Sequence, residues 1–327
     1  MKYTFLLAGL GFLAACQSSN QEQPTENTSK WADSAAMQAI DTEGFAQHIK
    51  TLASDEFMGR MPGTEGETKT INYLKEEFQK LGLQPGNGDS YFQEVKMVEI
   101  TSQPQGAMVV KNKSGKSVSL NYLDDYVALT RRVEEQTKLQ NSELVFAGYG
   151  VVAPEYNWND YEGLDAKGKT VVVMVNDPGF ASKDQELFNG EAMTYYGRWS
   201  YKYEEAARQG AAGLLIVHDT EPASYPWSVV RGGWSGPNLY LQAEDNNMSR
   251  AQVEGWISLE SAKKLFDLAG MDENLMQTAG ERGFKAQPMG LNISLTLDSK
   301  LKQSTSNNVL AVCPVQKWQE PLALLHF

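Results

Sequence analysis

Two short, almost wholly apolar runs constrain the fold of this 327-residue chain more than any other feature. Residues 170–175 read Thr-Val-Val-Val-Met-Val, and residues 213–217 read Gly-Leu-Leu-Ile-Val. Short runs that are rich in β-branched side chains and apolar on both faces are typical of strands buried inside a parallel sheet. Residues 203–210 lie between them, have helical composition and end in glycine. With a further apolar run at residues 144–152, this pattern predicts a compact α/β module.

The residues before and after this module predict elements of a second α/β domain that the module interrupts. Apolar residues spaced by three and four predict a helix over residues 42–53 and another that begins at Thr64, with Glu67 as its capping-box partner. Residues 91–100 are expected to form a strand, and residues 108–120 a β-hairpin.

The charge of the chain excludes one class of function. Its formal net charge is −12, whereas a nucleic-acid-binding protein needs a basic face. The hydrophobic fraction of 41% is ordinary for a globular protein. We therefore expect no nucleic-acid partner.

The amino terminus predicts export. Lys2 precedes a short apolar run at residues 5–13, well below the roughly 20 residues that span a bilayer. The following Leu-Ala-Ala-Cys, which ends at Cys16, resembles the cleavage box of bacterial lipoprotein signal peptides. The resemblance implies that residues 1–15 are removed, that Cys16 is lipidated, and that residues 16–35 form a flexible tether. The protein would then be lipid-anchored at the outer membrane or cell surface. An ordinary secretory signal is the alternative.

The cysteine count adds one expectation. The chain has two cysteines, so a lipidated Cys16 leaves Cys313 without a partner, and we expect no disulfide.

A series of short motifs follows in order along the chain. The first group consists of Leu52-Ala-Ser-Asp-Glu-Phe57, Gly59-Arg60, Pro62-Gly63-Thr64 and Gly82-Leu83-Gln84-Pro85. The second group consists of Phe146-Ala-Gly-Tyr-Gly150, Asp160-Tyr161, Gly168-Lys169, Arg198-Trp199 and Tyr225-Pro226-Trp227. Together they resemble secreted bacterial di-zinc aminopeptidases, metallopeptidase family twenty-eight, in the branch that carries a protease-associated domain.

The resemblance implies a split architecture. A protease-associated domain over residues 131–290 would be inserted into an incomplete zinc-peptidase α/β domain. Residues 36–130 would be the amino-terminal part of the peptidase domain. The chain would return to it over residues 291–327, with residues 308–312 as a strand of its sheet.

The same resemblance implies a metal site that we do not find in the sequence. Family members bind two zinc ions through His, Asp and Glu residues that follow the Asn-Val strand, beginning with a His-x-Asp motif. Residues 313–327 contain no such motif, and the three histidines, His48, His218 and His326, come from separate elements. We therefore expect a chain truncated before the metal ligands, with no catalytic or metal-binding residues and no aminopeptidase activity. The alternative is a non-enzymatic lipoprotein whose protease-associated domain binds peptides or protein partners.

Two further patterns bear on binding. Residues 148–153 satisfy the dinucleotide fingerprint G-x-G-x-x-A, but Pro154 and polar loop residues follow in place of a helix, which argues against a nucleotide site. Aromatic residues are concentrated in the loops of the predicted insert. They form either a peptide-contact surface or internal packing of the loops. The candidate contact residues are Tyr156, Trp158, Tyr161, Trp199, Tyr225 and Trp227.

Overall fold

The computed structural model describes residues 41–314, which fall into two units, one ending at Gly59 and the other beginning at Arg60. The predicted signal peptide, the tether with Cys16, and His326 lie outside the described residues. In the first unit, the helix expected over residues 42–53 is present as α2 (Thr42–Leu52), with Asp41 accepting a hydrogen bond from the Gly44 amide. A 3₁₀ segment, η1 (Asp55–Arg60), follows. Within residues 41–314, no helix combines the length and apolar character needed to cross a membrane.

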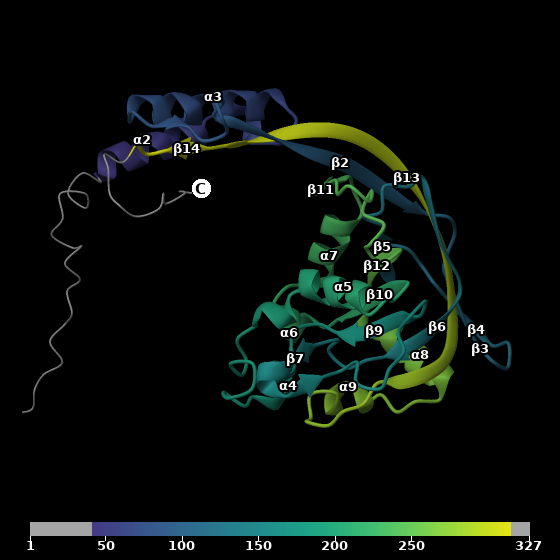
Figure 1. The fold of residues 1–327 in the computed structure, drawn as a ribbon. Helices are drawn as coiled ribbons and strands as arrows, with labels where there is room; N and C mark the ends of the chain where they lie inside the picture. Colours follow the sequence, from purple (N-terminus) through teal and green to yellow (C-terminus); the bar gives the residue numbers. More distant parts are fainter. Residues whose placement is uncertain (1–40, 315–327) are drawn as a thin grey trace, which may run out of the picture. The chain divides into compact units, whose positions relative to one another are not determined.

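The second unit is built on a mixed sheet of ten strands, with helices packed against it (Figure 1). The sheet strands are β2 (Phe92–Pro104), β3 (Met108–Asn112), β4 (Ser117–Leu120), β5 (Tyr126–Leu129), β6 (Gln136–Phe146), β9 (Thr170–Met174), β10 (Gly213–His218), β11 (Asn238–Leu241), β12 (Val253–Ser258) and β13 (Gln287–Val309). Their order is β11-β2-β13-β6-β9-β10-β12-β5, with the β3–β4 hairpin joined to β13.

The remaining elements are short pairs of strands, helices and turns. The strand pairs are β1 (Gln84–Pro85) with β14 (Ala311–Val312), and β7 (Val152–Ala153) with β8 (Trp158–Asn159). The helices and 3₁₀ turns are α3 (Glu65–Lys80), η2 (Pro154–Tyr156), α4 (Pro178–Ser182), η3 (Tyr195–Gly197), α5 (Trp199–Arg208), α6 (Thr220–Ala223), α7 (Trp227–Trp234), α8 (Leu259–Ala269) and α9 (Leu275–Thr278).

The α/β module predicted from the apolar runs is confirmed. Strands β6, β9, β10 and β12 are all parallel, and β9 and β10 pair from Thr170 with Gly213 to Met174 with Val217. Every residue of β9 and β10 is buried, because helices cover both faces of this part of the sheet. Helix α5 connects β9 to β10, and α8 follows β12. The chain is thus a mixed α/β fold.

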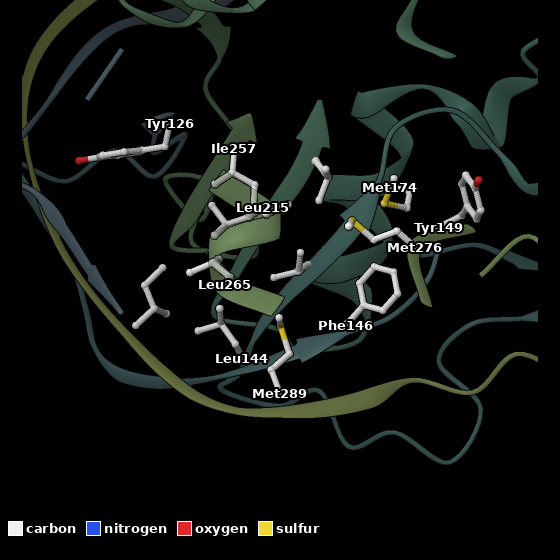
Figure 2. Close-up of a cluster of buried hydrophobic side chains, with 14 of the residues drawn as sticks. Tyr126, Leu144, Phe146, Tyr149, Met174, Leu215, Ile257, Leu265, Met276 and Met289 are labelled. Atoms are coloured by element: carbon white, nitrogen blue, oxygen red, sulfur yellow. The ribbon is translucent and has the colours of Figure 1, made fainter. Parts of the chain in front are cut away.

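Alternation along the parallel strands separates two hydrophobic cores. Val171 and Val173 belong to a core that includes Tyr203 of α5 and Val230 of α7. Val172 belongs to the other core, with Leu265 and Phe266 of α8 among its members. Part of this second core is drawn in Figure 2.

The sheet curves until its two ends approach each other. Strand β13 bends along its length (Figure 1), has register shifts against β6, and pairs with β2 as far as Val309 and Phe92. Strand β5 lies at the opposite end of the strand order from β11 and β2. Thr130 follows β5, and its amide donates to Ser102 Oγ of β2, 3.3 Å away. Strand β11, paired with β2, is therefore brought close to β5 and β12. The boundaries predicted at residues 131 and 290 fall within this continuous sheet and its connections.

One local expectation differs from the structure. Thr64 is the N-cap residue of α3, but its side chain makes no capping hydrogen bond. The Glu67 carboxylate accepts from the amides of Gly63 and Asn307 and from the Ser306 hydroxyl. Glu67 thus ties α3 to β13, where a capping box was predicted. Residues 308–312 were expected to be one strand of a sheet, and here residues 308–309 pair with β2 while residues 311–312 pair with β1. The residues of the dinucleotide-like motif run into β7, followed by the 3₁₀ turn η2, so no α-helix begins there, as the sequence predicted.

Candidate peptide-binding site

An aromatic cavity lies where the two ends of the curved sheet meet. It has a volume of about 310 Å³ and is lined from α5, α7, β5, β11 and β12. Its lining residues are Leu129, Arg131, Trp199, Tyr225, Val229, Val230, Gly233, Trp234, Asn238, Tyr240 and Trp256. Five of these eleven residues are aromatic, so the cavity offers a largely apolar wall with few polar groups. This composition is typical of small ligand sites.

The aromatic rings of the cavity pack against one another edge to face. The ring centroids of Trp199 and Trp234 are 5.9 Å apart, and those of Trp234 and Trp256 are 6.2 Å apart. Tyr203, behind the wall, packs on Trp234 at 5.4 Å and donates its hydroxyl to the Gly255 carbonyl. The walls are therefore held in place by neighbouring rings, while Trp199 remains 42% exposed at the surface.

The one charged lining residue, Arg131, lies between aromatic rings and a buried carboxylate. Its guanidinium carbon is 5.5 Å from the Trp199 ring centroid and 5.0 Å from that of Tyr240, within the range of cation–π attraction. Its Nε is 2.9 Å from Oε2 of Glu254, whose side chain is fully buried in β12. Burial raises the pKa of Glu254 to about 7, while the Arg131 and Arg250 guanidinium groups act to lower it.

Several polar atoms at this cavity lack hydrogen bonds. Arg131 Nε and Glu254 Oε2 are close, yet neither they nor Glu254 Oε1 has a hydrogen-bond partner of good geometry among the described residues. The indole N–H of Trp256, a lining residue that is 1% exposed, is also without an acceptor there. Buried polar groups are nearly always satisfied in folded proteins, so the Trp256 N–H at the cavity wall can donate to an acceptor that enters the cavity.

A second cavity, of about 620 Å³, lies at the carboxyl ends of the parallel strands. Tyr149 follows β6, Val175 follows β9, Asp219 follows β10 and Leu259 follows β12, and all four line it. Ligands of open α/β sheets commonly bind at this edge. Its lining mixes Lys183 and Lys263 with Asp219, Glu221 and Glu273, and it contains no aromatic cluster like that of the first cavity.

Behind this second cavity lies a buried charged cluster centred on Lys202 of α5. The Lys202 ammonium is fully buried and donates to the Tyr149 carbonyl at 2.6 Å. Asp160 accepts from the amides of Tyr149 and Val151 and from the indole of Trp158. Burial lowers the pKa of Lys202 and raises that of Asp160, each to about 7. The Lys202 ammonium and both oxygens of the Asp160 carboxylate each have hydrogen-bond partners within the protein, which is typical of a structural element.

The six aromatic residues predicted as a contact surface do not form one surface. Trp199 and Tyr225 line the aromatic cavity, and Trp227, half-buried, donates its indole N–H to the Leu123 carbonyl. Trp158 and Tyr161 are 5% and 4% exposed and belong to different cores, so these two follow the packing alternative. Tyr156 is half-buried, with its ring 4.3 Å from that of Phe188.

The histidines and acids of the described residues do not fit the two zinc ions that the family resemblance implies. Among residues 41–314, no three His, Cys, Asp or Glu side chains lie close enough together to share a metal ion. His218, at the end of β10, has its Nε2 3.0 Å from the Tyr225 carbonyl and packs against Trp227 and Trp256. Burial lowers the pKa of His218, in keeping with a neutral, hydrogen-bonded ring. Cys313 is a free, exposed cysteine.

Sequence reasoning missed Arg131, Tyr240, Trp256 and Glu254 as parts of one site. One signal was present, because Glu254 interrupts the apolar run Val253-Glu-Gly-Trp-Ile257 of a buried strand. A glutamate in such a run needs a cationic partner. Nothing in the sequence indicates that this partner is Arg131, because β5 and β12 are joined only in the folded sheet.

Comparison with known proteins gives a weak and partial likeness to aminopeptidases. No protein-family model matches the chain. An aminopeptidase from Aneurinibacillus sp. strain AM-1 is 16% identical over 84% of this chain and 48% of that chain, with a TM-score of 0.34. A zinc aminopeptidase from Bacillus subtilis is 16% identical over 83% of this chain and 47% of that chain, with a TM-score of 0.28. This chain thus spans about half the length of these structures, and TM-scores this low do not establish a shared fold or activity.

Proposed function

We propose that this protein binds peptides and that the aromatic cavity is the contact site. The observation behind the proposal is the meeting of Trp199, Tyr225, Trp234, Tyr240 and Trp256 around one cavity. Tryptophan and tyrosine supply large contact areas at a small cost in conformational entropy, and they are enriched where proteins bind peptides and other proteins. A volume of about 310 Å³ suits a single large apolar side chain.

The short motifs that follow one another along the sequence support the view that this peptide binding belongs to an aminopeptidase-like protein. In that setting, the α/β module positions a peptide for hydrolysis by zinc ligands that residues 41–314 do not supply. The described residues alone then bind peptides without cleaving them. The alternative is a non-enzymatic lipoprotein that uses the same cavity to bind peptides or protein partners. Both proposals include export, a lipid on Cys16 that attaches the protein to the outer membrane or cell surface, and no nucleic-acid partner.

Peptide binding is tested by fluorescence polarisation with a short labelled peptide that has blocked ends and one central tryptophan. Trp199→Ala removes an exposed wall of the cavity, so we expect affinity to fall about tenfold, which corresponds to about 1.4 kcal/mol. Tyr195→Ala is the matched control, because Tyr195 is also an exposed aromatic, at 57%, but does not line the cavity. Equal affinity for the two variants and the unaltered protein would contradict the proposed site.

The absence of cleavage is tested separately. We expect the purified chain to show no hydrolysis of leucyl-p-nitroanilide when zinc is added. Turnover that a chelator abolishes, together with two bound zinc ions per chain, would refute this part of the proposal.

A further inference from the structure

A basic cavity adjoins the aromatic one and shares two wall residues, Arg131 and Tyr240. It has a volume of about 570 Å³ and is lined by β2, β11 and the loop that leads from β11 to β12. Its charged lining residues are Lys96, Arg131 and Arg250, and no aspartate or glutamate is among the described residues that line it. This local excess of cations contrasts with the net charge of −12 of the whole chain.

The three cations are compensated to different degrees. Lys96 is exposed on β2 and has no ion pair among residues 41–314. Arg250 faces Glu204 across 3.6 Å, and both side chains are about one third exposed. Arg131 is the most fully compensated of the three, because its Nε is 2.9 Å from Oε2 of the buried Glu254. The exposed Lys96 can exchange water for a ligand carboxylate, and Arg250 can exchange its partly exposed partner Glu204 for one.

The floor of the basic cavity is held by hydrogen bonds to the backbone. Asn247, which is 6% exposed, donates its amide to the carbonyls of Arg131 and Leu241. Arg132 Nε donates to the Arg250 carbonyl at 2.9 Å. The loop that carries Arg250 is thereby fixed beside Arg131, so the cations are positioned before any ligand arrives. Such preorganisation lowers the entropic cost of binding.

We propose that the two cavities form one site for an acidic peptide segment. The aromatic cavity receives a large apolar side chain, and the basic cavity receives a glutamate or aspartate side chain next to it. Arg131 and Tyr240 border both cavities, so adjacent residues of one peptide reach both without leaving the surface. This inference rests on the proposed function and specifies which peptides are bound.

The test compares three labelled peptides of equal length with blocked ends. The first has a central tryptophan flanked by glutamates, the second replaces the glutamates with glutamines, and the third replaces the tryptophan with alanine. We expect the first to bind the full chain about tenfold more tightly than the second at low salt, with the ratio falling as salt is added. The third should bind more weakly than the first.

Two charge variants locate the effect. Lys96→Gln should lower affinity for the glutamate peptide several-fold and leave affinity for the glutamine peptide unchanged. Lys111→Gln is the control, because this substitution makes the same change in net charge. Lys111 is also an exposed lysine on a strand, but it does not line the cavity. Arg250→Gln is a second variant, at a partly exposed side chain. We expect it, like Lys96→Gln, to lower affinity for the glutamate peptide and to leave affinity for the glutamine peptide unchanged.

The outcomes separate the two proposals. Equal affinity for the glutamate and glutamine peptides would overturn the acidic preference and leave peptide binding intact. No binding of any of the three peptides would overturn the proposed function itself. Tighter binding of a single-stranded oligonucleotide than of the glutamate peptide would show that the basic cavity serves a different ligand, and would overturn the inference.

Discussion

The two buried charged clusters of the α/β module differ in how their polar atoms are satisfied. Around Lys202, the carboxylate of Asp160 and the ammonium are held by amides, an indole and a carbonyl. Around Arg131, the facing atoms of Glu254 lack good hydrogen bonds, and a cavity lies alongside. Helix α5 contributes to both, through Lys202 and Trp199. A closed network stabilises one conformation, whereas an incompletely satisfied one beside a cavity leaves polar groups for a ligand.

The largest expected effect tests the closed cluster. Lys202→Met leaves the Asp160 and Asp177 carboxylates buried without a cation, so we expect the free energy of unfolding to fall by about 3–5 kcal/mol. Lys263→Met is the control, because Lys263 is a partly exposed lysine of α8 whose ion-pair distance to Glu273 is 3.8 Å, and it should change stability by less than about 1 kcal/mol. Urea unfolding of the full chain measures both. Similar losses for the two variants would mean that the Lys202 cluster does not stabilise the fold.

The next effect concerns the pH dependence of the open cluster. Because burial raises the pKa of Glu254 from 4.5 to about 7, its contribution to stability is fully present below pH 4.5 and is lost as pH rises through 7. Glu254→Gln removes this dependence. We expect the unfolding free energy of the variant, relative to the unaltered protein, to increase by about 2 kcal/mol between pH 5 and pH 8.

This comparison has its own controls. The raised pKa of Asp160 affects the variant and the unaltered protein alike, so it cancels in their difference. Glu143→Gln makes the same chemical change at an exposed glutamate 3.4 Å from Lys169 and serves as the control outside the core. Urea unfolding at several pH values measures the difference, and parallel curves for Glu254→Gln and the unaltered protein would show that Glu254 keeps an ordinary pKa.

The strands could be predicted from sequence more readily than the site. Residues 170–175 and 213–217 are apolar on both faces, and only a position inside a covered parallel sheet suits such runs, so β9 and β10 were expected with nearly correct bounds. Local signals of the same kind mark the helix after β12, because Ser258 caps α8 and Gly270 ends it.

The site could not be predicted because it depends on contacts between distant segments. Arg131 follows β5, Trp199 begins α5 and Tyr240 lies in β11, and the curvature of the sheet brings them together. Composition identifies aromatic residues but not which of them are buried. Trp158 and Trp199 are equally aromatic in sequence, yet one donates a hydrogen bond inside the core and the other lines the cavity.

The smallest effect compares one tryptophan from each cluster. The Trp158 indole N–H is 2.8 Å from Asp160 Oδ1, whereas that of Trp256 has no acceptor among the described residues, and both side chains are buried. Replacement by phenylalanine removes the same atoms at both positions. Only Trp158→Phe also removes a hydrogen bond to a carboxylate, so we expect it to cost about 1–2 kcal/mol more than Trp256→Phe in denaturant unfolding.

Peptide affinity is a second measurement that distinguishes Trp158 from Trp256. If a peptide carbonyl accepts from the Trp256 indole, Trp256→Phe should weaken binding of the tryptophan peptide several-fold, while Trp158→Phe should leave it unchanged. Fluorescence polarisation with the same labelled peptide measures both. A greater stability cost at Trp256, or equal binding by the two variants, would mean that the unsatisfied indole is not part of a ligand site and that the two clusters serve the fold in the same way.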